Sequence, residues 1–267
     1  MKKQAFFTAL LLIMTWLSGC KNEKAVKPSV SECDTVAMAT INLCDTVDYS
    51  ILNGVNSHIS ANVEITYPKT YVNNENTDAL QKIYAKSVLN VSSDSSSLAS
   101  AFSHYVDNLV NRYVYNTYDL SDEEILSDYE PIVDCKLRVK IYPVYNADGL
   151  LSVCKEETSI IDDKTPEKRH FYYVINLLKM DKVEIYDIFS DESLAHVAEL
   201  LKNKLRKDLN VANDDEFADL GYYNFDNLSV SENFYITADS IVWNYSPREL
   251  SVLNEVKISL SRNEIDY

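Results

Sequence analysis

The stretch VDCKLRVKIYPVYNADGLLSVCKEE, residues 133–157, decides the fold that we expect for this chain. Apolar and basic side chains alternate in its first half: Val133, Cys135, Leu137, Val139 and Ile141 share one face, and Lys136, Arg138 and Lys140 the other. Such alternation is typical of a strand with one buried face. The turn-forming residues 146–149 (Asn-Ala-Asp-Gly) then predict an antiparallel hairpin with residues 150–157.

The segments on either side extend this hairpin into an α+β fold. Upstream, residues 59–67 alternate as a strand, and apolar residues at helical spacing predict helices over 77–91, with Thr77 as N-cap, and over 98–113. Downstream, we expect a strand over 171–178, a helix capped by Ser190, a hairpin over 234–245 and a strand over 256–260. Antiparallel sheets with helices packed on one face are the predicted architecture, and a parallel βαβ arrangement is the alternative.

Composition places the chain among folded, acidic proteins. It has 267 residues, 46% of them hydrophobic, which excludes a disordered chain, and 41 Asp and Glu against 25 Lys and Arg. A formal charge of -16 argues against a nucleic-acid partner, because a phosphate backbone must be neutralised by basic residues. Cations or basic proteins are the expected partners. Only four glycines are present, so a Gly-rich phosphate loop is not expected.

The N-terminus predicts export and a lipid anchor. Lys2 and Lys3 precede a short apolar run over 5–17, and Leu17-Ser18-Gly19-Cys20 resembles a bacterial lipobox. We therefore expect residues 1–19 to be a lipoprotein signal peptide and Cys20 to carry the acyl chains that tether the protein to a membrane. An ordinary signal peptide with a nearby cysteine is the alternative. Since Lys21 rather than Asp follows Cys20, we expect the outer membrane of the bacterial envelope.

Four further cysteines permit three disulfide pairings in an exported protein. The local pairing, Cys33 with Cys44 and Cys135 with Cys154, is the expected one. The alternative is that all four pack as small hydrophobic residues. Their spacing fits no zinc pattern.

Residues 20–47 show little periodicity and read as a lipidated, flexible tether. We expect an N-terminal α+β domain over 48–180 and a C-terminal domain over 181–267. The Asp-Thr-Val triplets at 34–36 and 45–47 resemble the short O-glycosylation motif of Bacteroidetes secreted proteins. Thr35 and Thr46 are therefore candidate acceptors.

A resemblance to a known family rests on the last third of the chain. Its elements are Ile185-Tyr186-Asp187-Ile188-Phe189-Ser190 with the helix after it, Asn233-Phe234-Tyr235-Ile236-Thr237, Ile241-Val242-Trp243-Asn244-Tyr245-Ser246-Pro247 and Val256-Lys257-Ile258-Ser259-Leu260. These segments resemble the C-terminal domain shared by RsiV-type lysozyme-sensing anti-sigma factors and certain peptidoglycan deacetylases. Residues 50–180 resemble the domain that commonly precedes it.

The resemblance implies binding rather than catalysis. The anti-sigma members bind c-type lysozyme through this extracellular domain, and in the deacetylases a separate catalytic domain supplies the metal site. We expect this chain to keep the sensing half, with a lipid anchor in place of the transmembrane and sigma-binding segments, and to lack the catalytic domain. No functional residue transfers position by position.

The sequence itself predicts no catalytic, metal-binding or cofactor site. His58, His104, His170 and His196 are scattered, and we read each as solvated or structural. Ser152 and Lys155 fit a Ser-x-x-Lys pattern but lie in a predicted strand, where their side chains alternate instead of sharing one helical turn. Clusters of acids read as solvated surface, since none fits a calcium loop.

Aromatic residues in an acidic loop form the candidate binding site. Tyrosine offers rigid, amphipathic contact area, and the chain has 19 of them. The candidate residues are Asp214, Asp215, Glu216, Tyr222 and Tyr223. Core tyrosines are the plainer interpretation.

Together these features predict a membrane-tethered, non-enzymatic binding module of the cell envelope. Lysozyme or another basic envelope-active protein is the expected partner. A peptidoglycan- or glycan-binding accessory lipoprotein is the alternative, and an envelope hydrolase the third.

Overall fold

The computed structural model describes residues 35–50, 56–92, 97–115, 134–211, 215–223, 225, 228–252 and 254–265. All of them belong to one compact unit, residues 32–267. The predicted signal peptide and Cys20 lie outside these ranges. Within them, no helix combines the length and apolar character needed to cross a membrane.

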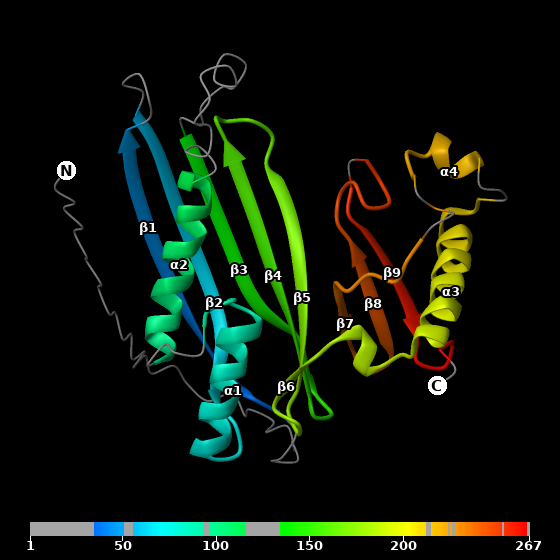
Figure 1. The fold of residues 1–267 in the computed structure, drawn as a ribbon, viewed down its shortest axis with the longest axis horizontal. Helices are drawn as coiled ribbons and strands as arrows, with labels where there is room; N and C mark the ends of the chain where they lie inside the picture. The colour runs from blue at the N-terminus through cyan, green and yellow to red at the C-terminus, as the bar shows by residue number, and fades with distance from the viewer. Residues whose placement is uncertain are drawn as a thin grey trace, which may run out of the picture. The chain divides into compact units, whose positions relative to one another are not determined.

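A six-stranded sheet is built around the predicted hairpin (Figure 1). Its strands, in spatial order, are β1 (Ala37–Ser50), β2 (Asn56–Thr70), β3 (Asp134–Ala147), β4 (Leu150–Ile161), β5 (Glu167–Asn176) and β6 (Asp181–Val183). Every neighbouring pair is antiparallel except β2 and β3, which run parallel. Asp148 and Gly149 adopt φ of 54° and 72° at the β3–β4 turn, as the Asp-Gly pair predicts.

Two helices, α1 (Asn74–Ser87) and α2 (Leu98–Tyr115), lie on the same face of this sheet (Figure 1). Ile59, Ile65 and Leu80, among others, are fully buried between helices and sheet. The predicted cap of α1 is wrong. Asn73 accepts the capping bond from Asn76, and Thr77 lies within the helix, where its Oγ1 donates to the Asn73 carbonyl at 2.7 Å. Both residue types cap helices, so position alone misled the prediction.

Strand β1 corrects the predicted tether, because residues 37–47 are extended and paired with β2. Ile41, Leu43 and Val47 face the first core, opposite Ile65, Val63 and Ile59. Asp45 occupies the same face and interrupts the apolar alternation, which hid the strand from a reading of the sequence. Pairing with the next strand, β2, stabilises β1, and the pattern within β1 alone does not encode that pairing.

A smaller, three-stranded sheet forms the C-terminal part, from β7 (Phe234–Ile236), β8 (Ser240–Tyr245) and β9 (Val256–Ser261). The 3₁₀ helix Ile185–Asp187, α3 (Asp191–Leu209) and the short α4 (Asp215–Asp219) precede it. Ser190 caps α3 by accepting from the Ser193 N–H, as predicted. Val197, Leu201 and Leu205 of α3 pack with the fully buried Trp243 in a second core.

The predicted α+β class is confirmed: antiparallel sheets dominate, and helices pack against them. The first hydrophobic cluster takes its residues from 36–177 and the second from 174–265. Both lie within the same compact unit. The division into two domains at 180/181 stays a prediction.

Candidate functional site

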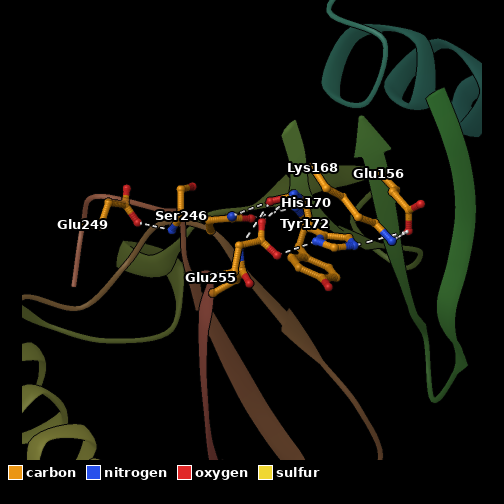
Figure 2. A network of polar contacts seen from close by, with 9 residues as sticks. Glu156, Lys168, His170, Tyr172, Ser246, Glu249 and Glu255 are labelled. Atoms are coloured by element: carbon orange, nitrogen blue, oxygen red, sulfur yellow. Dashed lines mark hydrogen bonds and ion pairs between the residues drawn. The ribbon is translucent and has the colours of Figure 1, made fainter. Parts of the chain in front are cut away.

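The outer edge of β5 is the place where the two sheets meet. β6 pairs only with Val174–Asn176, so the first part of β5 has no partner strand among the described residues. An exposed strand edge leaves peptide N–H and C=O groups without partners and invites another strand to pair. Side chains from the C-terminal part occupy this edge instead (Figure 2).

Asn233 replaces a partner strand at two adjacent peptide groups. Its Oδ1 accepts from the Tyr172 N–H at 2.7 Å, and its Nδ2 donates to the His170 carbonyl at 2.9 Å. An amide side chain carries the same donor and acceptor as a peptide unit, so it reproduces strand pairing at this point. Asn244 of β8 adds a second, longer bond to the His170 carbonyl, at 3.3 Å.

His170 is held from both sides by carboxylates (Figure 2). Its backbone N–H donates to Glu255 Oε1 at 2.7 Å, and its ring Nδ1 pairs with Glu255 Oε2. The Nε2 atom lies 3.3 Å from Glu156 Oε2, which also pairs with Lys168 Nζ at 2.9 Å. Since the His170 and Glu255 side chains are each only 14% exposed, this chain of contacts fastens β9 to β5 away from bulk water.

Burial and ion pairing act on Glu156 in opposite directions. Burial raises the pKa of its carboxyl, but Lys168 and His170 lower it by more, so its pKa lies below the ordinary value. Glu156 is therefore held as a carboxylate. Burial also raises the pKa of the Tyr172 phenol, whose ring stacks on Tyr235 with centroids 4.5 Å apart.

Two hollows border the segment that follows β5. The first, about 260 Å³, is lined by residues 171–174 of β5, residues 182–186 and residues 232–234. The second, about 460 Å³, is lined by parts of the same segment together with Leu150, Asn176, Ile236 and others. Lys182 and Val183 line both, so residues 181–188 form a wall between them. Asn233, which fastens the sheets, also lines the first hollow.

We call residues 181–192 the acidic segment. Five of its side chains are exposed acids: Asp181, Glu184, Asp187, Asp191 and Glu192. Lys182 is its one basic residue and lies 3.2 Å from Glu184. Tyr186, 63% exposed, stands among them at the first hollow.

This arrangement suits a cation rather than an anion. Phe171, Tyr172 and Tyr173 are among the residues that line the hollow, and Glu184 and Glu232 line it as well. A guanidinium or ammonium group is attracted both by aromatic faces and by carboxylates. Within the described ranges, no three His, Cys, Asp or Glu side chains are grouped to hold a metal ion.

The loop residues that the sequence singled out lie elsewhere. Asp214 is outside the described residues, and Asp215 begins α4, which also contains Glu216. Tyr222 packs edge-on against Phe217 and bridges to Ser251, and the Tyr223 N–H donates to the Leu250 carbonyl. Among the described side chains, Glu216, Tyr222 and Tyr223 do not line either hollow.

The predicted Cys135–Cys154 disulfide is not formed, and both buried thiols are free. Cys135 faces Ile161 and Cys154 faces Tyr142, so seven register positions separate them, or roughly 23 Å at about 3.3 Å per residue. A disulfide needs Cα atoms within about 7 Å. Burial also raises the pKa of the Cys135 thiol, to about 11.

The other predicted modification sites stay predictions. Cys33 lies outside the described residues, and its expected partner Cys44 is an exposed, free thiol that donates to Asn62 Oδ1 at 3.0 Å. Thr35 and Thr46 are both exposed, Thr46 on β1. Cys20 lies outside the described residues.

Sequence reasoning missed the residues that join the sheets. Asn233 and Glu255 lie 61 to 85 residues from their partners on β5. Asn233 does stand just before an apolar strand, in the segment Asn233–Thr237 that carried the family resemblance, but its role depends on a contact that sequence spacing does not encode.

Comparison with known proteins supports the fold, and a family model matches part of the segment that carried the resemblance. Residues 186–251 match the sequence model of a family described as a protein of unknown function, DUF3298. No curated protein matches this chain. The RsiV-like assignment stays a prediction.

Two solved structures are similar. One is a DUF3298 family member from Bacteroides fragilis, with a TM-score of 0.68, 16% identity and coverage of 86% of this chain and 92% of its own. The other is a DUF3298 family protein from Pseudomonas aeruginosa, with a TM-score of 0.49, 12% identity and coverage of 85% and 92%. At this identity the first likeness concerns the fold alone.

Proposed function

We propose that this chain is a membrane-tethered, non-enzymatic binding module of the bacterial envelope that recognises a strongly basic protein. The observation that carries the proposal is the first hollow, whose lining includes the exposed Tyr186, Glu184 and Glu232 together with Phe171, Tyr172 and Tyr173. A lysine or arginine side chain of the partner enters this hollow. The lipobox at 17–20 supports the tether.

Charge supports the same partner class. Residues 181–267 contain 18 Asp and Glu against 8 Lys and Arg. A field of this sign accelerates encounter with a basic protein and repels acidic ones. Five exposed acids lie in the acidic segment, and one of them, Glu184, lines the hollow.

A c-type lysozyme is the named candidate. It is strongly basic, and the C-terminal segments of this chain resemble the domain with which lysozyme-sensing anti-sigma factors bind it. Lysozyme binding and envelope location are both parts of the proposal. The DUF3298 match covers the acidic segment from Tyr186 onward.

Binding to a panel of c-type lysozymes, measured by calorimetry with the purified full chain at several salt concentrations, tests the proposal. We expect submicromolar binding at low salt that weakens as salt rises, because exposed charges are screened. Inhibition of muramidase activity is measured in parallel. Absence of binding at tens of micromolar at low salt would contradict the lysozyme proposal.

Variants locate the site. Glu184→Gln with Glu232→Gln should weaken lysozyme binding about five- to tenfold at low salt. Asp78→Asn with Asp107→Asn, two exposed acids on α1 and α2, removes the same charge far along the sequence and is the control. Lys182→Ala should have the opposite sign and strengthen binding, because it frees the Glu184 carboxylate. Equal effects of the test and control pairs would show that only net charge matters.

The glycan alternative gives a different pattern. Binding to sacculi that is indifferent to salt and lost with Tyr186→Ala would identify a peptidoglycan accessory instead. Turnover of a muropeptide library would identify a hydrolase.

A further inference from the structure

The outer edge of β1 ends the six-stranded sheet on the side away from β6. Its 14 residues pair with β2 on one side, and no described residue pairs with the other side. Ile41, Leu43 and Val47 are only half-buried there, whereas Ile59, Val63 and Ile65 opposite them on β2 are fully buried. A further strand at this edge would cover the remaining apolar surface.

This edge lacks the usual features that prevent strands from pairing. Natural edge strands carry lysine, proline or bulges, or are very short. β1 has no Lys, Arg or Pro, and residues 37–44 carry no charge at all. Its register irregularity lies at one end, between Ala37 and Met38.

The strand is complementary to itself in one register. If two copies run antiparallel about a two-fold axis at Cys44, residues 38–50 of each copy pair in full. Asp48 then faces Thr40, and Asp45 faces Leu43, so no two like charges are directly opposed. A centre at residue 45 would place Asp45 directly against its own copy, which is destabilising.

The same register keeps the two copies consistent on both faces. Residues with odd numbers, which face the helices in β1, pair with odd-numbered residues of the second copy. Ile41 therefore lies opposite Val47, and the helix-bearing faces fall on the same side. Thr40, Asn42, Cys44 and Thr46 line the open face.

Cys44 marks the centre of this pairing. Its thiol is free and exposed, in contrast to the buried Cys135 and Cys154. Directly opposed residues of antiparallel strands have Cα atoms about 4.5 or 5.5 Å apart, which lies within the span that a disulfide needs. An exported, unpaired thiol at a symmetric position suits contact with its own copy.

We propose that the chain forms a two-fold symmetric dimer in which β1 pairs antiparallel with β1 of a second copy, centred on Cys44. The two six-stranded sheets then form one continuous sheet. The dimer does not depend on the ligand proposed for the acidic segment, which lies at the other end of the sheet order.

Association under reducing conditions tests the pairing and its register. The full chain is studied by sedimentation equilibrium, after its mass has shown Thr46 to be unmodified. Thr40→Asp places a carboxylate against Asp48 of the second copy at two symmetric positions, and we expect about a tenfold larger dissociation constant. Thr40→Lys, with the opposite charge, should leave the dimer intact or strengthen it.

Thr66 provides matched controls. Thr40 and Thr66 bond to each other through their hydroxyls at 3.0 Å, so Thr66→Asp and Thr66→Lys lose the same bond but lie on β2. They should not change association. A monomer at all concentrations, or equal effects at positions 40 and 66, would overturn the proposal.

Oxidised glutathione gives an independent readout. Two Cys44 thiols and one glutathione disulfide exchange to give a Cys44–Cys44 bond and two glutathione thiols. We expect a covalent dimer that maps to Cys44 by peptide analysis and that Cys44→Ser abolishes, while Cys33→Ser retains it. A bond between Cys33 and Cys44 of the same chain would overturn the dimer centred on Cys44.

Discussion

At the scale of single residues, His170 of β5 helps to hold the C-terminal part against the six-stranded sheet. Glu255 holds its backbone N–H and its Nδ1, and Glu156 approaches its Nε2. The sequence suggested a solvated or structural histidine, because no second histidine lies at ligand spacing. The structure gives it contacts with Glu156 of β4 and with Glu255, the residue before β9, which spacing alone does not predict.

Glu156→Gln should change the pH dependence of stability. Lys168 and His170 hold the pKa of Glu156 below its ordinary value, so the carboxylate contributes stability that is present near neutral pH and is lost as pH falls through that lowered pKa. The variant should be less stable than the parent at pH 7, and the difference should shrink on acidification. Urea unfolding at a series of pH values measures it.

Glu64→Gln is the control for this prediction, since it removes a more exposed pair with Lys140, 3.2 Å apart. Parallel pH profiles for the Glu156 variant and the parent would show that the Glu156 contacts contribute no pH-dependent stability.

At the scale of elements, the two edges of the six-stranded sheet differ in what covers them. β5 is covered by the side chains of Asn233, Asn244 and Glu255, whereas β1 has an edge that no described residue pairs. The first edge is partly closed by these side chains, and the second is the edge that the proposed dimer uses.

Asn233→Ala should destabilise the protein by about 1–3 kcal/mol, because it leaves the buried Tyr172 N–H without its acceptor. Urea unfolding measures the loss, and hydrogen exchange of the Tyr172 amide should become faster than in the parent. Asn203→Ala, on the exposed face of α3, is the control. Unchanged exchange at Tyr172 would contradict the role given to Asn233.

Elements that depend on local signals could be predicted from the sequence. The α3 helix follows from its apolar spacing and from Ser190, and the β3–β4 hairpin from alternation and an Asp-Gly turn. β1 could not be predicted in this way, because Asp45 interrupts its pattern and pairing with β2 stabilises it. The parallel β2–β3 pair likewise depends on a connection through both helices.

At the scale of the whole molecule, two hydrophobic cores lie in one compact unit. Their joint is partly apolar and partly polar: Ser152 of β4, fully buried, bonds to both peptide groups of Ile236 in β7, at 2.7 and 3.2 Å. Ser152 is also the serine of the Ser-x-x-Lys pattern, and its hydroxyl is engaged in this structural contact.

Trp243 should report whether the two cores unfold together. It is fully buried in the second core, and the other tryptophan, Trp16, lies in the predicted signal peptide. We expect its fluorescence and far-UV circular dichroism, which reports chiefly on the larger sheet and helices, to change at the same urea concentration. Asn233→Ala should separate the two transitions if the joint couples the cores; coincident transitions in that variant would contradict this coupling.

The candidate site was less predictable than the fold. Its aromatic lining comes from β5, its carboxylates from residues 184 and 232, and its shape from a joint that spans 61 to 85 residues. Composition revealed an acidic, tyrosine-rich chain, but it directed attention to Tyr222 and Tyr223, which pack locally. Only the folded register brings Tyr186 and Glu232 to the same hollow.

The side-chain closure of β5 also has a consequence for folding during synthesis. Synthesis from the N-terminus delivers β5 roughly sixty residues before Asn233 and roughly eighty before Glu255. During that interval the edge is bare, and a chaperone that shields strands has most to protect. Clipping of the tail ahead of residue 233 would restore that immature state in a finished protein and turn its sheet into an acceptor for foreign strands.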